Sequence, residues 1–493
     1  MTVSRGMVAA GHPQTAAVGA QVLREGGNAV DAVLASMLAS WVLEPLLTGP
    51  GGGGYMLVAG AGTEPTLLDF FVAAPGADAG ATHAELLPIE VDFGGARQIF
   101  NCGPASCGVS GTPAGIAAAA ERWGVVPLAD LAAPAAQLAR DGIRINAQQG
   151  YIFEILAGLL LRGEPAAQEL FAPGGRVLRA GDTFRSDDFA DTIERLGRDG
   201  AEPFYRGDLA DAVVEHVTRG GGLLGTTDLA AYGALPREPV RADYHGRQVL
   251  TNPPPSAGGI LLALALGRLD ALDRAPRPEE LAAVMRDVQE LRTPAFTAGL
   301  AETGFLQRFL AANLGSTTHI SALDADGLAC SATCSNGTSS GVVVPGTGIH
   351  LNNIMGEEDL NPLGFFRDPP GLRMPSMMSP TVVLGADGEV ELVLGSAGSN
   401  RIRSAILQVV VNVVDHGMSA AEAIAAPRLH VEGGVAYAEP GIDVAAIAGA
   451  GSPAPFTEQN LFFGGVQAVE RDAVSGLLSG AGDPRRGGAA VAA

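Results

Sequence analysis

Gly-Ser-Thr-Thr-His-Ile-Ser (residues 315–321) is the stretch that decides the fold of this 493-residue chain. It leads into two alternating apolar runs, 319–323 and 328–335, joined by an Asp-Ala-Asp-Gly turn (324–327). Asp-Gly between two such runs predicts a β-hairpin. A threonine at the start of a buried strand is ordinarily a good strand former. It can also be a nucleophile, because cleavage before Thr317 would free an α-amine with a pKa of about 8 that can take the hydroxyl proton.

Composition narrows the classes of function. The chain is 47% hydrophobic, which is enough for a large core in one elaborate domain or two merged domains. The net charge is −22 and all 31 basic residues are arginine. Without lysine, Schiff-base chemistry is excluded. Without a basic stretch, nucleic-acid binding is not expected.

The sequence lacks the motifs that would indicate secretion, a membrane span or a metal site. The first residues do not form a signal peptide, and no apolar run reaches the length of a membrane span. We therefore expect a soluble cytoplasmic protein. The four cysteines form no Cys-x-x-Cys pair, and the eight histidines form no His-Glu-x-x-His motif. Reduced structural thiols, no metal and no cofactor are the expectation.

The first part of the chain predicts helices that lie against a sheet. Residues 15–25 and 29–43 are helical in pattern, and the second segment is apolar on most faces, as in a buried helix. Four glycines (51–54) then precede a strand at 55–59. From 112 to about 250 the pattern is mainly helical, which predicts a helical lobe.

The second part predicts a strand, a glycine loop and a helix in succession. Residues 275–314 are helical in pattern and lead to Thr317. A hairpin is expected over 381–394, followed by the loop 395–400 and a helix at 401–416. The Gly/Ala-rich tail from 480 to 493 is expected to be frayed.

Motifs in this order resemble the γ-glutamyltransferase family of N-terminal-nucleophile hydrolases, over nearly the whole chain. They include Gly-Gly-Asn-Ala-Val-Asp-Ala at 26–32, Pro-Pro-Pro-Ser-Ala-Gly-Gly at 253–259, Thr-Thr-His at 317–319, and the segments 9–13, 51–54, 111–113, 139–142, 351–353, 378–381 and 395–402. The resemblance implies an α/β fold, a four-layer αββα sandwich with a helical lobe. It also implies a precursor that cuts itself into a large segment, 1–316, and a small segment, 317–493, which together form one domain.

The catalytic positions of the family are present. By resemblance, Thr317 is the nucleophile and passes through an acyl-enzyme. Ser335 matches a family threonine that hydrogen-bonds the nucleophile, and it keeps the hydroxyl. The N–H groups of Gly398 and Ser399 match the oxyanion hole, at the start of a helix.

The main substrate-binding position is changed. The family has Asp-Phe-Arg-Glu-x-Ala-Pro, whose arginine holds the substrate α-carboxylate, and Phe71 stands at that arginine in the matching segment 69–75. A phenyl ring cannot form the paired hydrogen bonds that a guanidinium makes with a carboxylate. Arg373 and Arg401 are possible substitutes, although both match family positions that serve structure.

Four other recognition positions differ from the family. Gly337 replaces an asparagine and Ile354 replaces a glutamine. The aspartate that pairs with the substrate amine falls at Glu357. Of two adjacent serines, Ser376 remains and the second is Met377. The resemblance therefore implies a more apolar, re-purposed substrate pocket.

Three enzymatic functions and one other fit this pattern. We expect a hydrolase or transferase acting on a small non-glutamyl substrate of antibiotic metabolism, with carbon–carbon cleavage in alkylproline biosynthesis as one form. The alternatives are a γ-glutamyltransferase or glutathione hydrolase, and an acylase-like amide hydrolase. From another class, an unprocessed, inactive binding protein remains. Neither a nucleic acid nor a membrane is an expected partner.

Overall fold

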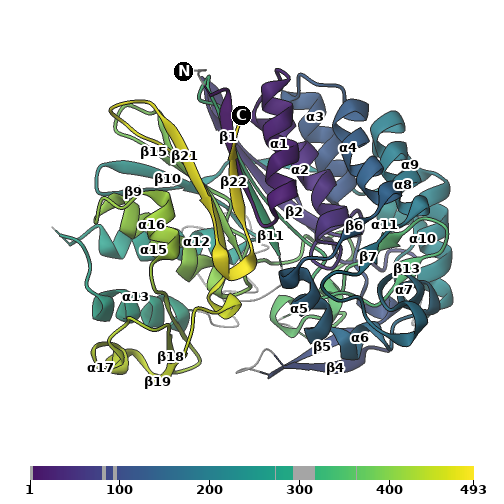
Figure 1. The fold of residues 1–493 in the computed structure, drawn as a ribbon. Helices are drawn as coiled ribbons and strands as arrows, with labels where there is room; N and C mark the ends of the chain where they lie inside the picture. The colour runs from purple at the N-terminus through teal and green to yellow at the C-terminus, as the bar shows by residue number, and fades with distance from the viewer. Residues whose placement is uncertain (1–3, 80–84, 93–96, 273, 292–316, 362–363) are drawn as a thin grey trace.

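The computed structural model describes residues 4–79, 85–92, 97–272, 274–291, 317–361 and 364–493. In these residues two antiparallel sheets lie face to face, and helices cover the outer face of each sheet (Figure 1). The predicted four-layer αββα sandwich is therefore confirmed.

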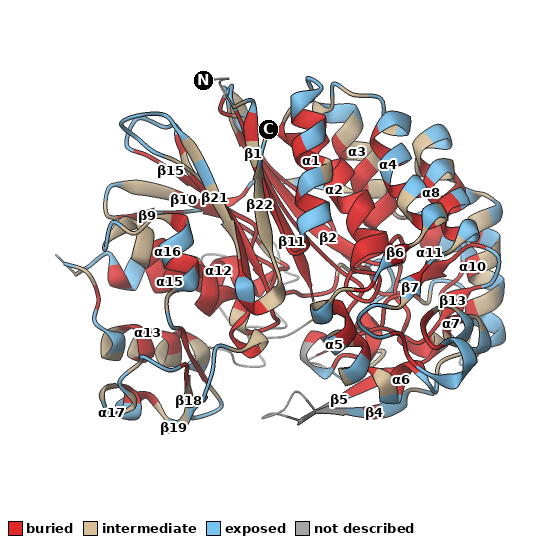
Figure 2. Cartoon of the chain, viewed as in Figure 1, coloured by how far each residue is buried: buried red, intermediate tan, exposed pale blue. Residues whose placement is uncertain are grey.

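The first sheet holds the predicted hairpin at its centre. Its strand order is β22-β1-β11-β12-β2-β3-β8. The bounds are β1 Gly6–Ala10, β2 Gly53–Gly60, β3 Thr63–Phe70, β8 Leu235–Arg237, β11 Thr318–Asp324, β12 Ala329–Ser335 and β22 Ala489–Ala492. The hairpin strands β11 and β12 are buried at every position. Figure 2 shows the same burial along β2 and β11.

The second sheet has the order β21-β20-β16-β15-β10-β9. The bounds are β9 Val240–Tyr244, β10 Arg247–Thr251, β15 Thr381–Leu384, β16 Val390–Ala397, β20 Gly465–Arg471 and β21 Leu478–Gly482. The hairpin expected over 381–394 is β15–β16. Helices α12 (Ala257–Leu269), α15 (Arg401–Val414) and α16 (Ala420–Ala425) cover the outer face of this sheet, and α13 (Pro278–Glu290) packs on α12 and β17 (Leu429–Glu432).

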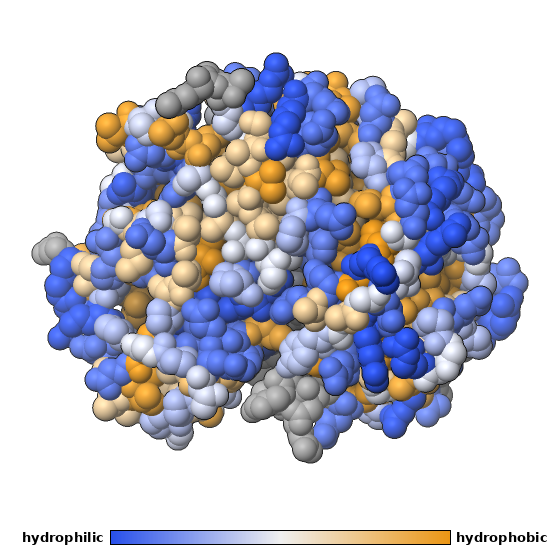
Figure 3. All heavy atoms as spheres, viewed as in Figure 1, coloured by the Kyte–Doolittle hydropathy of each residue, from blue (hydrophilic) through white to orange (hydrophobic). Residues whose placement is uncertain are grey.

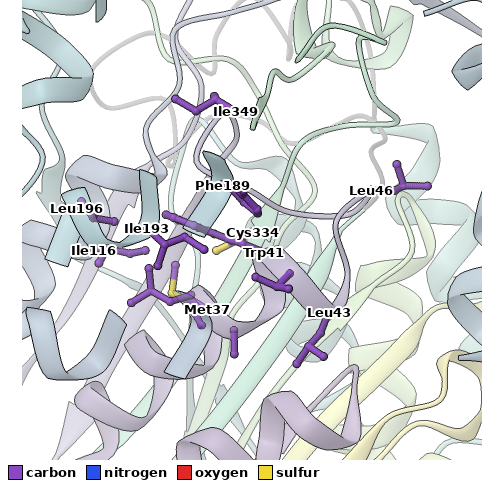
Figure 4. Packing of buried hydrophobic residues seen from close by; sticks show 14 of the residues in the cluster. Met37, Trp41, Leu43, Leu46, Ile116, Phe189, Ile193, Leu196, Cys334 and Ile349 are labelled. Atoms are coloured by element: carbon purple, nitrogen blue, oxygen red, sulfur yellow. The ribbon is translucent and has the colours of Figure 1, made fainter. Parts of the chain in front are cut away.

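The two predicted N-terminal helices pack on the first sheet. They are α1 (Pro13–Arg24) and α2 (Ala29–Leu43), and every residue of α2 is buried. Trp41 of α2 stacks on Phe189 with ring centroids 6.5 Å apart, and Cys334 of β12 lies close by (Figure 4). The helix thus has the sheet on one side and other helices on the other, which explains why its sequence is apolar all round.

The helical lobe is shorter than predicted. Its helices are α3 Thr112–Trp123, α4 Leu128–Asp141, α5 Ala147–Ile155, α6 Ala157–Leu160, α7 Pro165–Phe171, α8 Asp187–Asp199, α9 Glu202–Arg206, α10 Asp208–Arg219 and α11 Thr226–Ala230. The expectation of helix up to 250 is wrong, because the chain there forms β8, β9 and β10. In β9 buried and exposed residues alternate, which is the period of a strand.

The expectation of a frayed tail is also wrong. The end of β22 is held by β1, and β21 pairs with β20 in the other sheet. Small residues make this possible, since a Cβ on Gly480 would lie 2.8 Å from the carbonyl oxygen of Ala468. Of the helical segment expected over 275–314, α13 is described, and residues 292–316 lie outside the described part of the chain.

The remaining elements are small. Short strands pair as β4 Leu87–Asp92 with β5 Arg97–Cys102, β6 Ile143–Arg144 with β7 Thr183–Phe184, β13 Val343–Val344 with β14 Ile349–His350, and β17 Leu429–Glu432 with β18 Val435–Ala438, which also pairs with β19 Ser452–Pro455; the short helix α17 is Val444–Ile447. Hydrophilic residues cover much of the helical side at the right of Figure 3. Among the described residues, no helix combines the length and apolar character that a membrane span requires.

Candidate active site

Neighbouring strands bring three predicted site residues to one end of the first sheet. Thr317 lies one residue before β11, Ser335 ends β12 opposite Gly53 of β2, and Phe71 follows the last residue of β3. Paired residues on adjacent strands have side chains on the same face. The register therefore directs Thr317, Ser335 and Phe71 toward the second sheet. Strands are about 4.8 Å apart, so three spacings separate Thr317 from Phe71 by roughly 14 Å.

His319 fixes the strand that carries Thr317. It is 1% exposed, and its ring nitrogens contact the hydroxyls of Thr333 at 2.8 Å and Ser321 at 2.9 Å. Burial lowers its pKa to about 3, so the ring is neutral at physiological pH. A Cβ on Gly395 of β16 would lie 2.2 Å from this ring, so glycine allows the second sheet to approach β11 closely. His319 is therefore a buried, hydrogen-bonded residue at the contact between the two sheets.

The glycine loop follows β16 and reaches the same place. Ala397, the last residue of β16, lines a cavity that also contains Thr317. Gly398 has φ +121°, and a Cβ there would lie 2.6 Å from the Cα of Gly464. Among the described residues no acceptor is recorded for the Gly398 N–H. The loop ends where α15 begins, so its N–H groups lie at the positive end of a helix dipole, as an oxyanion hole requires.

Glu357 supports the loop after Ser335. The Ser335 hydroxyl accepts a hydrogen bond from the Gly337 N–H at 2.8 Å, and the Thr338 N–H donates to the Glu357 carboxylate at 2.9 Å. Gly337 has φ +67°, and a Cβ there would lie 2.2 Å from Oδ1 of Asn353. A larger side chain therefore cannot stand at 337 without a change in this loop. Glu357 is 2% exposed and contributes to the loop's hydrogen bonds.

Phe71 belongs to an apolar cluster between the sheets. Its side chain is 1% exposed and stacks on Tyr55, with ring centroids 5.5 Å apart. Ile354, Met374 and Met378 are part of the same cluster. Two of the positions that depart from the family, 71 and 354, are thus brought together by the fold.

Ser376 and Met377 are directed differently. The Ser376 hydroxyl accepts a hydrogen bond from the Met378 N–H at 3.0 Å, and its carbonyl oxygen accepts one from the Ala257 N–H at 2.7 Å. Met377 packs in the core beneath α12 and α15, in a different cluster from Phe71. The fold therefore does not join Met377 to the apolar cluster around Phe71.

Arg373 and Arg401 are engaged in structural contacts. Arg373 donates to the Phe71 carbonyl oxygen at 3.2 Å and lies over the Tyr232 ring, 4.0 Å from its centroid. Arg401 donates to the Phe462 carbonyl oxygen at 2.9 Å and lies over the ring of the same residue. These contacts agree with the structural roles that the sequence favoured for both arginines.

Sequence reasoning missed two charged residues beside Thr317. A cavity of about 30 Å³ is lined by Gly11, Glu44, Leu47, Gln148, Gln149, Ile152, Thr317, Thr318, His319, Ala397, Leu461, Gln467 and Arg486. Glu44 is 2% exposed and accepts a hydrogen bond from the Thr318 hydroxyl at 3.0 Å. Burial raises its pKa to about 7. The available signal was an acidic residue directly after the apolar helix α2. Arg486 lay in the tail that was expected to be frayed.

Comparison with known proteins gives the family. The model of the family described as gamma-glutamyltranspeptidase matches residues 15–293 and 277–493. The chain belongs to this family. Gamma-glutamyltranspeptidases and their relatives are hydrolase and transferase enzymes, and the predicted enzyme class is confirmed.

Individual members of the gamma-glutamyltranspeptidase family resemble the chain over most of its length. The glutathione hydrolase proenzyme of Escherichia coli (strain K12) is 32% identical over 479 residues, covering 86% of this chain and 81% of the relative. The acylase ACY 1 proenzyme of Pseudomonas sp. (strain SE83) is 33% identical over 477 residues, covering 89% and 85%. The crystal structure of cephalosporin acylase from Bacillus halodurans superposes with a TM-score of 0.84 at 27% identity, covering 99% of this chain and 96% of that one. The chain is thus similar both to members named glutathione hydrolases and to members named acylases.

Proposed function

We propose that this chain is a self-cleaving enzyme with Thr317 as nucleophile, and that it transfers or hydrolyses a non-glutamyl acyl group. Cleavage before Thr317 would give segments 1–316 and 317–493. The observation that carries the proposal is that the strand ends with Thr317 and Ser335 and the glycine loop after β16 lie at the same end of the two sheets. Thr317 directly precedes β11 and Ser335 ends the adjacent strand β12, and Ala397, which leads into the loop with Gly398 and Ser399, lines the same cavity as Thr317.

The proposed reaction uses groups that this chain supplies. The freed amine of Thr317 takes the proton from the Thr317 hydroxyl, and the oxygen attacks a substrate carbonyl carbon. The N–H groups of Gly398 and Ser399 bind the oxyanion that forms. As the oxyanion collapses, the leaving group takes the proton and an ester on Thr317 remains. Water or an amine then attacks the ester and releases the acyl group.

The preference for a non-glutamyl group is supported by the cluster around Phe71. A glutamyl α-carboxylate placed there would meet two stacked rings and the Ile354 side chain in place of a guanidinium. An unpaired buried charged group costs on the order of 1–3 kcal/mol or more. Glu357, the match for the residue that pairs with the substrate amine, accepts a hydrogen bond from the Thr338 N–H in the loop after Ser335. An apolar acyl group suits these surroundings better.

Two matched substrates test the acyl preference. We expect the purified protein to run as two fragments with Thr317 at the start of the smaller one, and to hydrolyse hexanoyl-p-nitroanilide faster than γ-glutamyl-p-nitroanilide. Faster turnover of the glutamyl substrate would contradict the proposal and favour the glutathione hydrolase alternative. A single chain of 50.0 kDa that hydrolyses neither anilide would favour the inactive binding protein.

The finer proposal concerns the substrate and the bond that is cut. We propose that the substrate is a compound of antibiotic metabolism. One form of this proposal is cleavage of a carbon–carbon bond beside a keto-acid group in alkylproline formation. The apolar cluster around Phe71 supports it, whereas the name of the Pseudomonas acylase supports an amide. The released co-product separates the two, since amide cleavage liberates an amine, whereas carbon–carbon cleavage liberates a fragment in which the proton has been added to carbon.

A further inference from the structure

Arg486 lies beside the glycine loop on the far side of Thr317 from Phe71. It ends the short 3-10 helix Pro484–Arg486, between β21 and β22. One terminal nitrogen of its guanidinium lies 3.3 Å from the position that a Cβ on Gly398 would occupy, and the side chain lines the cavity that holds Thr317. The strand β1 and the edge strand β22 flank β11 on this side, whereas β12, β2 and β3 lead to Phe71.

The hydrogen-bonding capacity of Arg486 is only partly used. One terminal nitrogen donates to the Leu461 carbonyl oxygen at 3.2 Å, and the buried Nε has no acceptor among the described residues. In the described part of the chain no carboxylate oxygen lies within ion-pair distance of Arg486, and Asp483 and Glu44 act on its charge only from farther away. The neighbouring Arg485, in contrast, pairs with Glu439 and Asp483.

Partial burial of the Arg486 guanidinium without a direct ion pair is unfavourable in free energy. Burial lowers the pKa of Arg486 to about 10, which leaves it cationic at neutral pH. Asp483 and Glu44 attract this cation from a distance, and Arg401 and Arg428 repel it. A cation partly removed from water without a carboxylate in direct contact carries a desolvation penalty that a paired cation recovers in part. An anionic ligand in the cavity would supply the missing partner. The guanidinium also offers paired donors that match the two oxygens of a carboxylate.

We infer that Arg486 binds a carboxylate on the part of the substrate that lies across the reacting carbonyl from Phe71. The carboxylate belongs either to the leaving group of the substrate or to the acceptor that later occupies the same place. The assignment rests on the proposed function, which places the reacting carbonyl between Thr317 and the Gly398 N–H. The substrate is then apolar toward Phe71 and anionic toward Arg486. The anionic contact of the family is thereby moved to the opposite side of the nucleophile.

Binding of two small aromatic amines tests this inference without turnover. 5-Amino-2-nitrobenzoate carries a carboxylate, and p-nitroaniline is its uncharged counterpart. We expect the processed wild-type protein to bind the carboxylate about tenfold more tightly in equilibrium dialysis, as loss of a charged hydrogen bond predicts. Arg486→Gln should remove the preference, and Arg486→Lys should keep part of it. Arg471→Gln changes the net charge equally at the half-buried end of β20, where Arg471 pairs with Glu389, and serves as the control.

Equal wild-type affinities, or a preference that survives Arg486→Gln in protein with unchanged thermal unfolding, would overturn the inference. If Arg486→Gln unfolds, the Arg486→Lys comparison decides by whether a cation alone retains binding. Hexanoyl anilides with and without a ring carboxylate report on the leaving group, and acyl transfer to 4-aminobenzoate versus aniline reports on the acceptor. A carboxylate preference in binding without turnover would refute Thr317 as nucleophile, and turnover without a carboxylate preference would refute only the role of Arg486.

Discussion

Replacing Glu44 by glutamine should stabilise the uncut chain at alkaline pH and leave it unchanged at acid pH. The Glu44 carboxyl is 2% exposed, and burial raises its pKa from 4.5 to about 7. Because the folded pKa is raised, the folded chain binds the proton more tightly, and its stability falls as pH rises from about 4.5 to 7. A shift of this size corresponds to about 3 kcal/mol, since each pKa unit is worth about 1.4 kcal/mol. Glutamine can still accept the Thr318 hydrogen bond without ionising.

The comparison is made in a Thr317→Ala background, where the chain is expected to stay in one piece. An unfolding entropy of about 2.1 cal/mol/K per residue gives about 1 kcal/mol/K for this chain, so Glu44→Gln should raise the unfolding midpoint by roughly 3 °C at pH 8. At pH 4.5 the difference should vanish. The exposed Glu458→Gln is the matched control and should show neither effect. An equal shift at both pH values, or no shift at pH 8, would refute the reasoning from burial.

Three further outcomes are expected. Thr317→Ala should leave a single 50.0 kDa chain by mass spectrometry with no anilide hydrolysis, whereas Thr317→Ser should still be cut; cutting in the alanine variant would exclude Thr317 as the nucleophile. Gly398→Ala should lower kcat at least about 100-fold in the cut protein, because the new Cβ meets the Gly464 backbone and displaces an oxyanion donor; unchanged kcat would place the oxyanion hole elsewhere. Phe71→Arg should lower the unfolding midpoint far more than Phe71→Leu by calorimetry, since it places a charge in an apolar cluster; similar midpoints would mean that arginine reaches a counter-ion.

The fold was largely predictable because its signals are local. The Asp-Gly turn at 326–327 and the flanking alternation predicted β11–β12, and an all-apolar helix predicted the burial of α2. Two errors came from reading composition as structure. The strands after 235 were assigned to the helical lobe, and the tail was expected to fray because it is rich in glycine and alanine. In the structure, small residues are what allow the tail to pack between neighbouring strands.

The site was only partly predictable. Thr317, Ser335 and Gly398 were named from motifs, and their meeting depends on strand order, which a single sequence does not show. Glu44 and Arg486 lie far apart in sequence, and each by itself resembles an ordinary surface residue. Glu44 is buried and Arg486 is partly buried, and their meeting in one cavity follows from packing of the whole chain, so no local pattern could have joined them.

The strand order also determines what self-cleavage would do to the assembly. In the first sheet β1 lies between β22 and β11, so a strand of the large segment is held on both edges by strands of the small one. The second sheet likewise continues from β15 of the small segment into β10 of the large one. A cut before Thr317 would create two polypeptides that share both sheets. They could then separate only by unfolding, and dilution alone would not dissociate the enzyme.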